Sequence, residues 1–187
     1  MHVGEYILAL VIIVLGLALT DLALSTHRLI RRRADVKFDV TPIIAALLAA
    51  YLVFANFWGD YRHFQGVTSA GLWETLPNLA ILFLNFLVAA AALPDHWEGK
   101  LDLWQYYLAA RRQFWVLVGL TSLVASVYFV ATTWPQRFPL AIYASGPIVI
   151  TICATLCFTT RRWLHLLLLS ALFATIVFGN GDLRIAG

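Results

Sequence analysis

The chain has 187 residues, of which 61% are hydrophobic and 12% are charged, and its formal net charge is +3. Soluble domains carry about 25% charged residues, and a soluble globule of this length could not bury so much apolar surface. The composition therefore excludes a water-soluble protein and predicts an all-α, polytopic membrane protein.

Six apolar stretches are each long enough to cross a bilayer, since a helix needs about 20 apolar residues to do so. They predict one domain, a bundle of six transmembrane helices over residues 6–26, 41–58, 73–93, 114–134, 140–160 and 163–179. Only Arg161 and Arg162 separate the last two stretches. A single helix over both would be about 60 Å long, twice the bilayer, so we expect a tight turn at this arginine pair.

The basic residues set the expected orientation. Most of the 13 lysines and arginines lie in the loops after the first, third and fifth stretches. By the positive-inside rule these loops face the cytoplasm, and both termini are then outside, in the periplasm. The small loops and compact size suggest a bacterial inner membrane. Tryptophans such as Trp104 and Trp115 fall near predicted inner span ends, as in an aromatic belt.

The longest loop contains a helix start. Asp102 followed by Gln105 fits an N-terminal capping pattern, and no helix breaker follows it. We therefore expect the fourth helix to begin near Asp102 and to extend from the cytoplasmic interface into the membrane.

Asp21 is an ionisable residue inside the first predicted span, about 10 Å from the basic residue Arg28. Such residues are costly in a membrane and are candidates for function. One hypothesis is a cation or proton site. The alternative is a structural ion pair with an arginine at another helix end, namely Arg111, Arg112, Arg161 or Arg162.

Further polar side chains follow the next two spans. Glu74, Asn78 and Asn85 lie within about 40° on one helix face, and Asn85 falls near mid-membrane. This stripe predicts either a hydrated lining or interhelical hydrogen bonds. Asn56 and Asp60 share a face of the second span and could form a vestibule for cations, or could be ordinary solvated residues at a helix end.

Motifs for enzyme chemistry are missing from the sequence. It has no Gly-x-Ser-x-Gly elbow, no His-Glu-x-x-His pair and no phosphate-binding glycine loop. We therefore expect no enzyme activity, no cofactor and no metal site. His27 and His165, at two span ends, allow one remote alternative, a haem-binding electron-transfer protein, because a transmembrane haem needs histidines from facing helices.

Two function classes follow. The first is conduction or transport of a small cation or proton along the polar face of the third span, with Asp21 as the inner site. The second is a structural or accessory subunit of a membrane complex without transport activity. The expected partners are the lipid bilayer and either further copies of the chain or other membrane subunits, and no nucleic acid.

Overall fold

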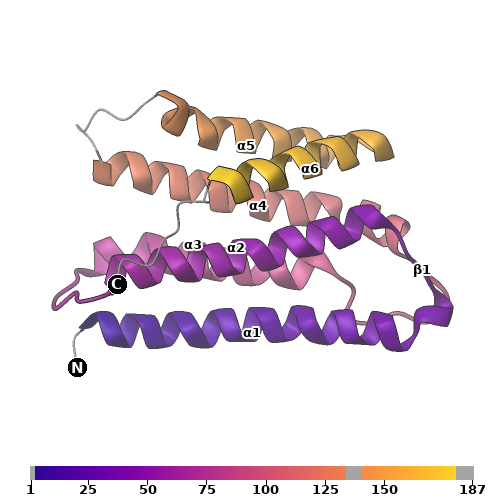
Figure 1. Cartoon of the computed structure of the whole chain (residues 1–187), viewed down its shortest axis with the longest axis horizontal. Helices are drawn as coiled ribbons and strands as arrows, with labels where there is room; N and C mark the ends of the chain where they lie inside the picture. Colours follow the sequence, from indigo (N-terminus) through magenta and orange to yellow (C-terminus); the bar gives the residue numbers. More distant parts are fainter. Residues whose placement is uncertain (1–2, 134–139, 180–187) are drawn as a thin grey trace.

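Six α-helices make up most of the chain that the computed structural model describes, residues 3–133 and 140–179. Their axes run along the long axis of the molecule (Figure 1). The predicted all-α class is confirmed for these residues. The helices are α1 Val3–Arg31, α2 Val40–Phe64, α3 Leu72–Ala92, α4 Leu103–Thr133, α5 Leu140–Phe158 and α6 Arg162–Gly179.

Four of the helices, α1 to α4, are long and apolar enough to cross a membrane. α5 and α6 contain shorter apolar segments, over 145–158 and 162–176 of the described chain. The expected break at the arginine pair is confirmed, because α5 ends at Phe158 and α6 begins at Arg162. The expected start of the fourth helix is also confirmed. Asp102 Oδ1 accepts hydrogen bonds from the backbone N–H groups of Trp104 (3.0 Å) and Gln105 (3.3 Å).

One end of the bundle is closed by paired loops, and we call it the basic end (residues 25–39, 93–104 and 159–165). There the short 3₁₀ helix η1, Arg33–Asp35, leads into β1, Val36–Lys37. β1 pairs in parallel with β2, Leu101–Asp102, and so joins the α1–α2 connection to the α3–α4 connection. Lys37 Nζ donates to Asp102 Oδ2 at 2.8 Å, and this hydrogen bond holds the pKa of Asp102 below its ordinary value. Two-residue strands carry no periodic signal, and the sequence did not predict them.

The buried side chains form two clusters, and both include residues of α1, α2 and α3. A smaller one lies among α1, α2 and α3 and includes Leu15, Val53 and Leu82. A larger one joins all six helices, with Leu48 and Leu156 fully buried in it. Both clusters include residues of α2 and α3, so a polar side chain buried on these helices lies among apolar ones.

The opposite end of the bundle contains a close approach at Gly4. The Gly4 backbone N–H donates to the Val67 carbonyl at 3.0 Å, which fixes the start of α1 against the α2–α3 turn. A Cβ at this position would collide with the Phe64 carbonyl oxygen, a backbone atom that cannot swing away. The start of α1 and the end of α2 therefore lie at the same level, and α3 begins at Leu72 after the turn that follows.

Gly4→Ala is expected to lower the free energy of unfolding by about 1–3 kcal/mol, because the α1–α2 contact must open to admit the methyl group. The matched control is Gly16→Ala on the same helix, where a Cβ meets no atom within 4 Å. That control should be neutral or slightly stabilising, since alanine favours a helix. Denaturant unfolding in detergent measures both, and equal stability of the two variants would contradict the close approach.

Candidate functional site

Three of the six predicted path residues make contacts within their own helix region. Glu74 is exposed, and its Oε2 accepts a hydrogen bond from the Gly71 backbone N–H at 3.0 Å, which caps the start of α3. On α2, Asn56 Nδ2 donates to Asp60 Oδ2 at 2.9 Å, one helical turn away. Asp60 is 6% exposed, so this carboxyl group is buried with an amide as its hydrogen-bond donor.

The two asparagines of α3 contain polar atoms without partners. Asn85 is 3% exposed, and its Oδ1 has no hydrogen-bond donor among the described residues. Asn78 Nδ2 is likewise buried and has no acceptor in that part of the chain. An unpaired buried polar group costs about 1–3 kcal/mol, and native proteins usually satisfy such groups with protein atoms or water. Asn85 Oδ1 can therefore accept a hydrogen bond from water or bind a cation, and Asn78 Nδ2 can donate to water.

Asp21 is half-buried on α1 and forms no ion pair or hydrogen bond with the described residues. The ion pair of the alternative hypothesis, with Arg111, Arg112, Arg161 or Arg162, is not formed among the described residues. Arg162 pairs with Asp39 instead, and Arg111 donates to the carbonyl oxygens of Leu108 and Cys157.

Depth along the bundle relates these residues to one another. α1, α2 and α3 pack against one another, and their ends meet near Gly4. Counting 1.5 Å per residue from that end, Asp60, Asn78 and Asn56 lie at about 6, 9 and 12 Å. Asn85 lies at about 20 Å and Asp21 at about 27 Å. The predicted site residues thus occupy successive depths on three contacting helices.

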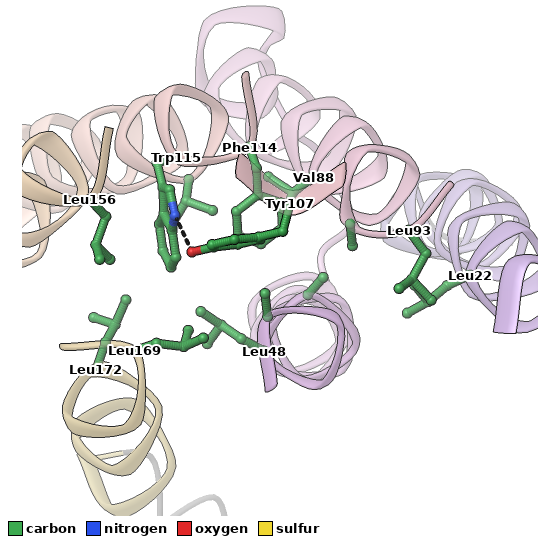
Figure 2. Packing of buried hydrophobic residues seen from close by; sticks show 14 of the residues in the cluster. Leu22, Leu48, Val88, Leu93, Tyr107, Phe114, Trp115, Leu156, Leu169 and Leu172 are labelled. Atoms are coloured by element: carbon green, nitrogen blue, oxygen red, sulfur yellow. Dashed lines mark hydrogen bonds between the residues drawn. The ribbon is translucent and has the colours of Figure 1, made fainter. Parts of the chain in front are cut away.

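A second polar cluster, which the sequence did not predict, lies between α4 and α6. Trp115 Nε1 donates to Tyr107 Oη at 2.9 Å, and Tyr107 Oη lies 2.9 Å from His165 Nδ1 (Figure 2 shows the first bond). His165 Nε2 lies 3.0 Å from the Thr159 carbonyl oxygen. The Trp115 indole N–H can only donate, so the Tyr107 hydroxyl accepts from it and donates its own proton to His165 Nδ1. The ring proton of His165 is then on Nε2, which donates a hydrogen bond to the Thr159 carbonyl oxygen. Every member is satisfied with His165 neutral.

Aromatic and charged contacts connect this cluster to the start of α2. Trp104 stacks on Tyr107 and meets the His165 ring edge-on, with centroids 5.7 and 5.8 Å away. The guanidinium of Arg162 lies 5.7 Å from the centroid of Trp104 and also pairs with Asp39. Asp39 is 6% exposed and caps α2 through the Thr41 backbone N–H, which donates to Oδ1 at 2.9 Å. The cluster therefore fixes α2, α4 and α6 relative to one another.

These contacts bear on the haem alternative. His165 uses both ring nitrogens in hydrogen bonds, so neither is available as an axial ligand while the bonds persist. His27 lines an apolar groove between α1 and α2. Within the described residues, no group of three or more His, Cys, Asp or Glu side chains is placed to hold a metal ion, and Cys153 and Cys157 are free thiols.

Comparison with known proteins gives no family to which the chain can be assigned. No protein-family model matches it, and neither a curated protein nor a solved structure is similar to it.

Proposed function

We propose that the protein conducts protons or a small monovalent cation across a membrane along polar side chains of α1, α2 and α3. The observation that supports this proposal is the pair of buried atoms without partners on α3, Asn78 Nδ2 and Asn85 Oδ1. Water molecules would satisfy both atoms, because buried water in proteins binds polar groups that lack other partners. Each such water makes two to four hydrogen bonds, so it needs further polar groups nearby. Asp60 and Asn56 lie at the depth of Asn78 and could supply such partners at the outer end.

In this proposal Asp21 is the inner site. Its carboxyl group lies deepest from the Gly4 end and forms no ion pair with an arginine of the described residues. A carboxylate within a span marks ion pathways and proton relays in membrane proteins. The six helices would all cross a bacterial inner membrane, with the basic end in the cytoplasm and both termini in the periplasm.

Flux into reconstituted vesicles tests the proposal. Purified protein in liposomes containing a pH-sensitive dye should admit protons, or potassium when that gradient is imposed. Asn85→Leu should lower the rate at least about tenfold, which needs a barrier increase of about 1.4 kcal/mol from loss of the central polar group. The matched control is Thr155→Val on α5, since Thr155 is exposed and hydrogen bonds to its own helix at 2.9 Å.

Asp21→Asn separates charge from shape in the same assay. The amide retains the size of the carboxyl group and removes its charge, so flux should fall while the protein remains folded. Wild-type vesicles without flux of protons or monovalent cations would contradict conduction. Loss of folding in Asp21→Asn would assign Asp21 a structural role.

The second candidate is an accessory subunit, and a groove between α1 and α2 favours it. The groove has a volume of about 720 Å³ and is lined mainly by apolar side chains, among them Leu19, Ile43, Leu47 and Phe54. A helix of another membrane subunit, or of a second copy of this chain, could bury these side chains. Absence of flux together with a stable complex in native lipid would favour this function over conduction.

A further inference from the structure

A second cavity, of about 720 Å³, lies at the basic end where α1 meets the α3–α4 connection. Three arginines near the end of α1, Arg28, Arg31 and Arg32, form one wall, and the segment 95–99 forms the other. Arg28 and Arg31 lie in the last turn of α1, a helix apolar and long enough to span a membrane, and Arg32 follows directly after it. The cavity therefore lies at the level of lipid headgroups if α1 crosses a bilayer.

Contacts within the wall fix the shape of the cavity. Arg28 donates to the Asp95 carbonyl oxygen at 3.0 Å and pairs with its carboxylate at 3.4 Å. Ser25 Oγ donates to the same carboxylate at 2.7 Å. The Arg32 guanidinium lies 5.7 Å from the centroid of the Trp97 ring. The segment after α3 is thus held against α1 at two points, and the cavity between them is built by specific contacts.

Two of the arginines that line the cavity have no carboxylate partner in the described part of the chain. Asp95 is already shared by Arg28 and Ser25. Glu98 is the other carboxylate of the wall, and it forms no ion pair with the described residues. Arg31 has no hydrogen bond or ion pair among those residues, and Arg32 has its ring contact alone. Two guanidinium groups without carboxylate partners therefore face one cavity.

We propose that this cavity binds the phosphate group of an anionic phospholipid. The planar guanidinium presents paired N–H donors that match two phosphate oxygens, and arginine is favoured over lysine at such sites. Basic pockets at the cytoplasmic ends of transmembrane helices bind anionic headgroups in this way. Glu98 accepts hydrogen bonds, so a headgroup with hydroxyls, such as glycerol, fits the wall better than a bare phosphate. This inference is independent of conduction.

The test compares lipid binding by wild-type protein and three variants in nanodiscs or detergent, by native mass spectrometry. Wild type should retain phosphatidylglycerol in preference to phosphatidylcholine. Arg31→Gln with Arg32→Gln should bind phosphatidylglycerol about tenfold more weakly, because two charge-assisted contacts are lost. The affinity of the Arg31→Lys variant for phosphatidylglycerol should lie between those of wild type and the double variant. The matched control is Arg33→Gln in η1, an exposed arginine of the same run that does not line the cavity.

Soluble glycerol 3-phosphate distinguishes the two sources of the phosphate group. The ligand is added to protein in phosphatidylcholine alone, and the unfolding temperature is measured. No increase in unfolding temperature supports a lipid site. An increase that is lost when Arg31 is replaced assigns the cavity to a soluble phosphate ester. Unfolding temperature without ligand confirms that each variant is folded. Equal retention of phosphatidylglycerol by wild type and the double variant would overturn the proposal, as would an equal loss in Arg33→Gln.

Discussion

Tyr107→Phe is expected to lower the free energy of unfolding by about 2–6 kcal/mol. The change removes one hydroxyl from the core and leaves two buried groups without partners, the Trp115 indole N–H and His165 Nδ1. Each such group costs about 1–3 kcal/mol. All three residues are at most 4% exposed, so bulk water cannot replace the hydroxyl without opening the α4–α6 contact. Denaturant unfolding in detergent micelles measures the difference.

Tyr106→Phe is the matched control for this loss. Tyr106 is adjacent on α4 and half-buried, and it forms no hydrogen bond with the described residues. Removal of its hydroxyl should change stability by less than about 0.5 kcal/mol. Similar losses in the two variants would contradict the hydrogen-bonded chain from Trp115 to Thr159.

Arg162→Gln is expected to cost about 1–3 kcal/mol, because it leaves the buried Asp39 carboxylate without its cation. The double variant Arg162→Gln with Asp39→Asn should recover part of this loss. It contains no unpaired charge, and asparagine still caps the start of α2. The four unfolding free energies of this double-mutant cycle give the coupling between the two side chains.

The adjacent Arg161 provides the control for that cycle. Its side chain is exposed and makes no contact with an acidic group of the described chain. Arg161→Gln should leave stability unchanged within about 0.5 kcal/mol. A loss as large as that of Arg162→Gln would show that general charge at the turn matters, and not the pair with Asp39.

The helices could be predicted from sequence because each one is a long apolar run. Charged clusters and proline mark the ends of these runs, and the capping residue Asp102 marked the start of α4 without tertiary information. The arginine pair also located the α5–α6 turn, since a single helix there would have been too long for a bilayer. These are local signals, and the structure agrees with them.

The basic end could not be predicted, because its contacts join residues far apart in the chain. Lys37 and Asp102 are separated by 65 positions, and Tyr107 and His165 by 58. Trp115 was predicted to lie in an aromatic belt at a span end, but in the structure its side chain is fully buried. Hydropathy places such a residue in depth along a helix but does not say which helix its side chain faces. His165 was likewise placed at a span end, where it does lie, but its burial against Tyr107 was not predicted.

The polar path was predicted only as a set of residues at suitable depths. Helical spacing correctly put Asn56 and Asp60 on one face. It could not show that Glu74 caps its own helix, since that depends on the Gly71 backbone at the start of α3. Nor could it show that Asn78 and Asn85 contain buried atoms without partners, because that depends on how α1, α2 and α4 pack around α3.

Access of water to position 85 tests the conduction account most directly. Asn85→Cys and the control Val88→Cys are made in a background with Cys153→Ala and Cys157→Ala, and reaction with a small, charged, water-soluble thiol reagent is measured in membranes. Val88 is 0% exposed, lies one turn further along α3 and has no polar group to attract water. Conduction along α3 predicts rapid modification of the Asn85→Cys variant and little modification of the Val88→Cys variant. Equal protection of both cysteines in folded protein would show that the path is dry and would contradict it.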